Sequence, residues 1–209
     1  MNITVQDFKR ITYGHIALYS IMPITNILSV MERGILSHNR ASSLSHESIA
    51  LQDVQRRRDG KVINARKLHD YANLYFDYHN PMLSRVRSQN EDICVLSVNP
   101  EVLNLPGVVV TDRNAARMGA QFISPEEMTE ILDFGKIYMK YWITDDKYVS
   151  DENKAIKCAE VLVPDAIPFE YITGALVVSD SAEQKMKEQG FPHRIVVDET
   201  KFFKEGGTR

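Results

Sequence analysis

Residues 158–179 read CAEVLVPDAIPFEYITGALVVS, and this stretch decides the fold class. It holds two apolar runs rich in β-branched residues, 158–163 and 171–179, and Pro164 ends the first of them. Apolar runs of this length between turn residues are typical of buried β-strands. A short helix over 181–190, which ends on a glycine, and a last strand over 194–197 complete a strand-rich final third.

The earlier part of the chain is predicted to contain several helices. One begins at Pro23 and ends at Gly34, since proline favours the first helical turn and glycine the end of a helix. Other helices are predicted over 48–58 and 125–141, and strands over 11–17, 74–76, 93–98 and 108–110. Helices come early, strands cluster late, and the two do not alternate regularly. This order predicts an α+β fold in which helices flank a mostly antiparallel central sheet.

Length and composition indicate one globular domain, 1–209, since domains of roughly 100–200 residues are the norm. Hydrophobic residues at 44% and charged residues at 25% exclude a disordered, collagen-like or coiled-coil protein. Cys94 and Cys158, both in apolar surroundings, are too few for a disulfide scaffold or a cysteine-rich zinc site. No apolar run approaches the roughly 18 residues of a membrane span, and residues 1–10 lack the order of a signal peptide. We therefore expect a soluble protein of the reducing cytoplasm, with no membrane partner.

Positive charge is concentrated in one part of the chain. The net charge of −3 argues against a protein that coats nucleic acid without specificity. Between residues 51 and 90, however, eight lysines and arginines stand against four aspartates. This stretch is either a local patch that attracts phosphate or a solvated helix face with a few extra arginines.

The common motifs of nucleotide-binding and hydrolytic sites are missing from the sequence. It contains no glycine-rich phosphate loop, no Rossmann fingerprint, no His-Glu-x-x-His, no Gly-x-Ser-x-Gly and no paired cysteines. Any function of the protein therefore depends on dispersed residues.

Four dispersed features are candidates for a site. Glu160 stands in an apolar strand, where it either faces the open side or is held by a partner, because an unpaired buried carboxylate is costly. The run Arg56-Arg57-Arg58 is a binding group or a solvated helix end. The segment LYFDYHNPML, 74–83, is core or a wall on which a flat ring stacks. His15, in the strand predicted over 11–17, is a ligand contact or a hydrogen-bonded structural residue.

Taken in order along the chain, these features resemble the DarT family of DNA ADP-ribosyltransferase toxins. The resemblance covers nearly the full length, and its most specific parts are the aromatic segment that leads to Asn-Pro-Met-Leu at 80–83 and the strand Ala-Glu-Val-Leu-Val at 159–163. The other matching segments are 15–17, 26–37 and 48–58. The resemblance implies an ADP-ribosyltransferase fold, NAD+ as the co-substrate and no metal.

The resemblance also implies roles for individual residues. Glu160 is expected to be the catalytic glutamate, which stabilises the oxocarbenium ion formed on the ribose as nicotinamide leaves, as in glycoside hydrolysis. Arg58 is expected to be the catalytic arginine, with Arg57 as the alternative, and to hold a phosphate of NAD+ or steady the acceptor base. The residues expected to bind NAD+ are His15, Ile16, Ala17, Asn26, Ser29, Gly34, Ser37, Tyr75 and Arg57. DNA contacts are expected from Arg113, Asn114 and Arg117 in the 109–117 loop, and from Met82.

The chain departs from the family pattern near its start. The family often has His-Ile-Thr there, whereas this chain has His15-Ile16-Ala17 and so loses one hydroxyl. The spacing from that histidine to Asn26 is also longer, as if residues had been inserted around 18–22. The altered segment favours guanine over thymine as the modified base.

The function implied by the resemblance is transfer of ADP-ribose from NAD+ to a guanine or thymine base of single-stranded DNA, with release of nicotinamide. A base must be reached outside a stacked duplex, which favours a single strand as substrate. Such a toxin is expected to have a macrodomain-type antitoxin as its partner. The alternatives are an NAD+ glycohydrolase, an ADP-ribosyltransferase that acts on RNA or protein, and an inactive nucleic-acid-binding module.

Overall fold

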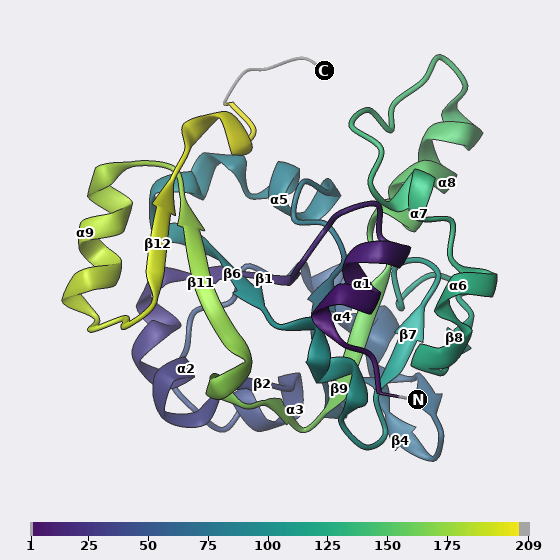
Figure 1. Cartoon of the computed structure of the whole chain (residues 1–209), viewed down its shortest axis with the longest axis horizontal. Helices are drawn as coiled ribbons and strands as arrows, with labels where there is room; N and C mark the ends of the chain where they lie inside the picture. The colour runs from purple at the N-terminus through teal and green to yellow at the C-terminus, as the bar shows by residue number, and fades with distance from the viewer. Residues whose placement is uncertain (1, 205–209) are drawn as a thin grey trace.

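The computed structural model describes residues 2–204, and an eight-stranded sheet runs through them (Figure 1). The strand order is β12-β11-β6-β1-β5-β9-β7-β8, and within this sheet β11 and β12 form the one parallel pair. Its strands are β1 Leu18–Pro23, β5 Tyr71–Tyr75, β6 Ile93–Val98, β7 Val109–Thr111, β8 Phe122–Ile123, β9 Glu160–Pro164, β11 Ile172–Val177 and β12 Arg194–Val197. Two short antiparallel pairs lie outside it: β2 Ile35–Leu36 with β10 Ala166–Ile167, and β3 Val62–Ile63 with β4 Arg66–Lys67. The predicted α+β class with a mostly antiparallel sheet is confirmed.

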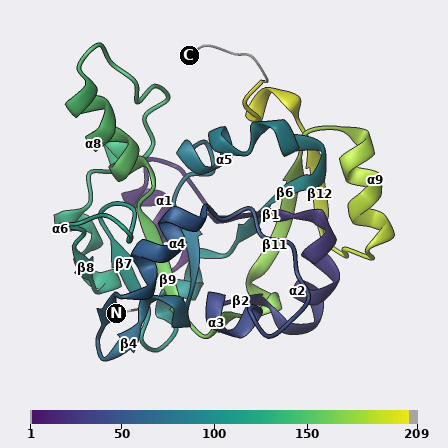
Figure 2. The ribbon, with the colours of Figure 1, turned by 180° about the vertical axis from the view of Figure 1, so that it is seen from behind.

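Helices lie against both faces of this sheet: α1 is nearer the viewer in Figure 1, and α4 is nearer in the reverse view of Figure 2. The α-helices are α1 Val5–Ile11, α2 Ile27–Arg33, α3 His38–Ala41, α4 Gln52–Asp59, α5 Pro81–Arg85, α6 Met128–Ile131, α7 Phe134–Ile137, α8 Lys147–Lys157 and α9 Asp180–Glu188. Shorter 3-10 helices are η1 Ile24–Asn26, η2 Leu68–Asp70, η3 Arg87–Asp92, η4 Pro100–Asn104, η5 Pro125–Glu127, η6 Phe169–Tyr171 and η7 Glu199–Lys201. None of the helices in the described part of the chain has both the length and the apolar character needed to cross a bilayer.

The two faces of the sheet carry different side chains. Leu74 of β5 and Val161 of β9 belong to the main hydrophobic core on one face. Because side chains alternate along a strand, Tyr75 and Glu160 project from the opposite face. These two residues are directly paired in the register of β5 and β9. The pleat of the sheet thus places Glu160 and Tyr75 side by side, away from the main core.

The sheet opens between β1 and β5. These strands are paired at a single position, Tyr19 with Tyr75, whereas β1 pairs with β6 at six positions and β5 with β9 at five. Beyond that one pair the strands separate, so the stretch 20–23 of β1 has no strand partner on its β5 side. Backbone groups along this stretch are therefore available to a ligand.

The strand predicted over 11–17 is wrong. Helix α1 occupies the start of this region, because Thr4 and Asp7 form a capping box that satisfies its first backbone N–H groups. Tyr13 and Gly14 then adopt φ angles of 56° and 105°, which end regular structure. Residues 15–17 form a loop, and β1 begins after them.

Two of the predicted helices are also shorter than expected. The helix predicted over 48–58 begins only at Gln52, and residues 45–51 are irregular. The region 125–141 divides into η5, α6 and α7, because the Asp133 carboxylate accepts a hydrogen bond from the backbone N–H of Lys136 at 3.0 Å and starts a new helix. Helix α8, which Asp146 caps, was not predicted. The other predicted strands and helices are present, and their ends differ by a few residues at most.

Gly34 generates a prediction about stability, because it has a φ of 77° and a Cβ added there would lie 2.1 Å from the carbonyl oxygen of Ile167. Gly34→Ala is expected to lower the free energy of unfolding by more than about 1 kcal/mol, measured by urea denaturation. Gly119→Ala is the matched control, since its φ is 78° and nothing lies within 4 Å of the added Cβ. Equal losses in the two variants would show that the close approach to Ile167 is unimportant.

Candidate active site

Arg58 and Glu160 form a buried ion pair at the centre of the site. Nη1 of Arg58 lies 2.9 Å from Oε2 and 3.2 Å from Oε1 of Glu160, and both side chains are buried. The backbone N–H of Ala115 also donates to Oε1, at 2.9 Å. A buried carboxylate requires such partners, because removing its charge from water is costly. Glu160 is therefore held by a partner instead of facing the open side, and Arg58 is not a solvated helix end.

Further contacts fix the loop that supplies the Ala115 N–H. Lys61 donates from Nζ to the carbonyl oxygens of Ala115 and Arg117, both at 2.6 Å. Burial, followed by the nearby charge of Arg58, lowers the pKa of Lys61 from its ordinary value. The backbone N–H of Glu160 in turn donates to Oγ1 of Thr111 in β7 at 3.0 Å. These contacts join β7, β9 and the 112–117 loop into one support for the glutamate.

Tyr75 stands next to Glu160 on the neighbouring strand. Burial, followed by the negative charge of Glu160, raises the pKa of Tyr75 well above its ordinary value of 10. The phenol therefore stays protonated at neutral pH and does not act as a base. It presents a flat ring and a hydroxyl group beside the ion pair.

A cavity of about 500 Å³ opens where β1 and β5 separate. Residues 20–23 of β1 line it together with Asn73 and Tyr75 of β5. Helices α4 and α5, which lie on the near side in Figure 2, contribute Arg58 and Met82. Glu160 does not itself line the cavity, but its partners Arg58, by ion pair, and Tyr75, by strand pairing, both do. The volume is within the range of roughly 300–1,000 Å³ found for small-molecule sites.

Residues 47–51, within the irregular segment 45–51, form one wall of the cavity. Asn26 holds this wall, because its Nδ2 donates to the carbonyl oxygen of Glu47 at 2.8 Å and its Oδ1 accepts from the N–H of the same residue at 3.1 Å. An asparagine can do both because its amide offers donors and an acceptor. The wall is thus attached to the start of α2 and continues into α4, which carries Arg58.

The structure brings some of the predicted site residues together at the cavity and places others elsewhere. Those that line the cavity are Arg58, Arg57, Asn26, Tyr75, Met82, Asn114 and Arg117. Those that do not line it, apart from Glu160, are His15, Ile16, Ala17, Ser29, Gly34, Ser37 and Arg113.

The loop 15–17 packs against another part of the molecule. The imidazole of His15 stacks on the ring of Tyr138, with centroids 3.6 Å apart, and burial lowers the pKa of this histidine. In its place, Ser20, Ile21 and Met22 of β1 border the cavity.

Several of the other predicted site residues have structural roles within the protein that do not involve a ligand. Ser37 caps α3 by accepting from the N–H of Arg40, and Gly34 allows the chain to pass close to Ile167. Ser29 lies on α2 and is partly buried. The guanidinium of Arg113 is held by Asp112 at 2.9 Å and by Glu152 at 2.8 Å. These pairings leave Arg113 less available to a substrate than Arg117, which lines the cavity.

Several cavity residues were not predicted from the sequence: Ser20, Ile21, Met22, Asn73, Gln55, Lys154 and Cys158. The alternation of β5 could have indicated Asn73, which is two residues before Tyr75 and projects from the same face. Lys154 and Cys158 come from α8 and its end, and tertiary packing alone brings them to β1. Burial raises the pKa of the Cys158 thiol to about 12, so it stays neutral.

The arrangement joins a carboxylate, a guanidinium and a neutral phenol at one cavity. A fixed carboxylate stabilises positive charge that develops on a reacting atom, and a guanidinium binds phosphate through several donors. Among the side chains of residues 2–204, no three His, Cys, Asp or Glu residues are grouped as metal ligands would be. The site is suited to a phosphate-bearing substrate whose reacting centre becomes positive.

Comparisons with known proteins identify the family of the chain. The family model described as DarT, ssDNA thymidine ADP-ribosyltransferase, matches residues 19–203. A DNA ADP-ribosyl transferase–DNA ADP-ribosyl glycohydrolase fusion protein of Thermosipho africanus is 31% identical over 196 residues, which are 89% of this chain and 49% of the relative. A DNA ADP-ribosyl transferase of Thermus sp. is 29% identical, over 81% of this chain and 84% of its own. The chain thus spans about half the length of the Thermosipho protein.

Solved structures are similar over most of the chain. The Thermosipho DarTG protein in complex with ADP-ribose gives a TM-score of 0.77 at 28% identity, over 90% of this chain and 51% of its own. Thermus sp. 2.9 DarT in complex with ADP-ribosylated ssDNA gives a TM-score of 0.76 at 26% identity, over 89% of this chain and 95% of its own. The fold is therefore that of the ADP-ribosyltransferases. Within that class, the chain belongs to the DarT family, and the resemblance seen in the sequence is confirmed.

The buried ion pair generates a second prediction about stability. Arg58→Ala is expected to lower the free energy of unfolding by about 3–5 kcal/mol, because it leaves the Glu160 carboxylate buried with too few partners. The neighbouring Arg57→Ala is the control, since Arg57 is exposed and its loss is expected to change stability by no more than about 0.5 kcal/mol. In urea denaturation, the double variant R58A/E160A should show a smaller loss in the free energy of unfolding than the sum of the losses in the two single variants. A loss in R58A as small as that in R57A would contradict the pairing.

Proposed function

We propose that the protein transfers ADP-ribose from NAD+ to a base of single-stranded DNA and releases nicotinamide. The observation that carries this proposal is the buried pair of Arg58 and Glu160 at the cavity of a chain that belongs to the DarT family. The solved complexes of Thermus sp. 2.9 DarT with NAD+ and with ADP-ribosylated ssDNA support both substrates.

Glu160 provides the electrostatic part of the mechanism. As the bond between nicotinamide and ribose breaks, the ribose develops the positive charge of an oxocarbenium ion, and nicotinamide leaves as a neutral ring. A carboxylate fixed in advance by Arg58 and Ala115 stabilises this charge without reorganising at the moment of reaction. Glu160 does not itself line the cavity, so the side chains between it and the ribose shift when NAD+ binds, before the bond breaks.

Arg58 acts on the phosphates or on the acceptor base. Only its Nη1 donates to Glu160, so the other guanidinium nitrogens are available to a phosphate of NAD+ or to the base as it loses its proton. Arg57, the preceding residue on the same helix, also lines the cavity, where it suits the second phosphate. Arginine stays charged, so positioning is its role instead of proton transfer.

The nicotinamide amide is best placed against β1. Residues 20–22 border the cavity and have backbone groups free of a β5 partner, and Tyr75 supplies a flat wall opposite them. This placement replaces the expected contacts of His15, Ile16 and Ala17, which lie outside the cavity. Asn26 supports the site indirectly, by holding the wall at Glu47.

The acceptor base is best placed near Asn114, Arg117 and Met82, which line the cavity. The altered segment at His15 was the reason to expect guanine, and the structure puts that segment away from the cavity. The description of the matching family model names thymidine, so we propose thymine as the modified base.

A partner that removes the modification is also part of this proposal. The Thermosipho relative joins its transferase to a DNA ADP-ribosyl glycohydrolase, and this chain spans about half of that protein. We propose that this chain acts as a toxin in the cytoplasm and is opposed by a glycohydrolase of the macrodomain type.

The principal test is Glu160→Gln, which keeps the shape of the side chain and removes its charge. Its rate of DNA modification is expected to fall by about 10²–10³, measured by mass spectrometry of short oligonucleotides that differ in one base and are incubated with NAD+. Glu152→Gln is the control, because Glu152 is exposed and does not line the cavity.

Three results would overturn parts of the proposal. Unchanged modification by E160Q would remove Glu160 from the mechanism. Free ADP-ribose with unmodified DNA would indicate a glycohydrolase. Modification of RNA or protein instead of DNA would show that DNA is not the acceptor. Absence of NAD+ turnover in the wild type would favour an inactive binding module.

A second test separates the two placements of nicotinamide. Asn26→Ala removes both hydrogen bonds to Glu47 and is expected to raise the KM for NAD+ several-fold, because the wall loses its attachment. His15→Ala is expected to leave this KM within about twofold, since its ring lies against Tyr138. Steady-state kinetics at saturating DNA measure both. The opposite ranking would restore the loop 15–17 as the nicotinamide site.

A further inference from the structure

A second hollow, of about 850 Å³, adjoins the active-site cavity. Leu51, Pro81, Arg85 and Lys154 border both hollows, so the two lie side by side. The second hollow, here called the outer groove, then runs along the end of α5 and past Trp142, before α8. Nothing in the proposed chemistry at Glu160 requires it.

The outer groove carries positive charge that is not neutralised. Arg85 and Arg87 are exposed, and within residues 2–204 neither has a carboxylate within 4.0 Å. Lys154 is 3.3 Å from Asp151, but both side chains are nearly half exposed, so water screens the pair. Among residues 2–204, none of those that line the groove is acidic.

Other arginines of the same basic stretch are already paired. Arg56, Arg58 and Arg66 contact Asp53, Glu160 and Asp165. The positive patch predicted over residues 51–90 is therefore divided in the structure. Its free charges include Arg57 in the cavity and Arg85 and Arg87 farther out, along one path.

Apolar surface accompanies these charges. Leu51 is 39% exposed at the junction of the two hollows, and Ile143 is 52% exposed on the other side of the groove. Trp142 lines the groove and is braced by Phe203 and His79, whose ring centroids are each 5.6 Å from its own. Trp142 is itself only 7% exposed and supports this wall from within. Cationic groups along a groove with exposed apolar side chains beside them suit single-stranded nucleic acid, because phosphates and bases are then contacted together.

We propose that the outer groove binds the DNA strand beside the modified nucleotide, with Arg85 and Arg87 on its phosphates and Leu51 and Ile143 against its bases. The inference rests on the proposed function for the identity of the ligand, and it extends that function from one base to its neighbours on one side. A strand whose target base enters the cavity near Met82 continues directly into the groove, because Pro81, the preceding residue, borders both.

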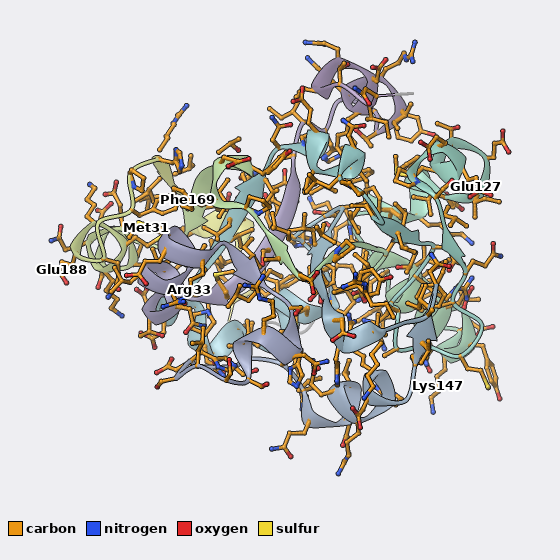
Figure 3. All side chains as sticks on the ribbon, turned by 90° about the horizontal axis from the view of Figure 1, so that it is seen from below. Met31, Arg33, Glu127, Lys147, Phe169 and Glu188 are labelled. Atoms are coloured by element: carbon orange, nitrogen blue, oxygen red, sulfur yellow. The ribbon has the colours of Figure 1, made fainter. Side chains whose placement is uncertain are left out.

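The test measures binding of the wild-type protein, without NAD+, to fluorescently labelled single-stranded DNA by anisotropy. Arg87→Gln is expected to raise the Kd several-fold at low salt and to reduce the slope of log Kd against log salt by about 0.7, the value for one phosphate contact on a single strand. Arg194→Gln is the matched control, an exposed arginine on β12, which packs beside α9. The control position lies away from the groove, which reaches α8 at Lys154. Figure 3 shows Glu188, at the end of α9, and Lys147, at the start of α8, on opposite sides of the molecule.

A second pair of variants tests the apolar side of the groove. Ile143→Glu places a negative charge in it and is expected to weaken binding by a similar factor, whereas Tyr148→Glu, at an exposed residue that does not line the groove, is not. Oligonucleotides with the target base at either end should show that flanking nucleotides strengthen binding on one side only, and that R87Q removes this gain.

The outcomes distinguish the groove from the reaction. If the wild type binds and modifies DNA but R87Q and I143E bind DNA as their controls do, the assignment of the outer groove to DNA is wrong and the proposed function stands. If the wild type neither binds nor modifies single-stranded DNA, both fail. Weaker NAD+ binding by R87Q with unchanged DNA binding would assign the groove to the dinucleotide and overturn the inference.

Discussion

A carboxylate buried without water has to be satisfied by fixed partners, and in this protein that requirement organises the site. Glu160 is reached by Arg58 from α4, by the Ala115 N–H from a loop, and through its own backbone by Thr111 of β7. Three separate parts of the chain therefore have to arrive together for the carboxylate to be buried at low cost. Since Arg58 also lines the cavity, the side chain that stabilises the fold is the one a ligand meets.

Local pattern predicted those parts of the fold in which one physical effect dominates. The apolar run ending at Pro164 and the glycine stop at Gly34 are both found as expected. The strand predicted over 11–17 failed because β-branched and aromatic residues were given more weight than the Thr4–Asp7 capping box just before them. The long helix predicted over 125–141 failed because the Asp133 side chain competes with the helical hydrogen bonds.

The site shows the same division between local and long-range information. Glu160, Arg58 and Tyr75 were indicated by segments that resemble the family, and the structure brings them together although Arg58 and Glu160 are 102 residues apart. The segment at His15 lies away from the cavity, and the opening between β1 and β5, which residues 20–22 border in its place, exists only once the sheet is formed. Lys154 and the 47–51 wall likewise reach the cavity through tertiary packing, which no periodicity in the sequence reports.

The closeness of the two hollows has a pharmacological consequence. Four residues, Leu51, Pro81, Arg85 and Lys154, border both, so one ligand can contact both hollows across these residues. On the proposed function, a single inhibitor that fills the cavity and carries an anionic arm along α5 would compete with the dinucleotide and the acceptor strand at once. Joining the two fragments in one molecule would raise their effective concentration for each other, and resistance would then require changes in two substrate sites together.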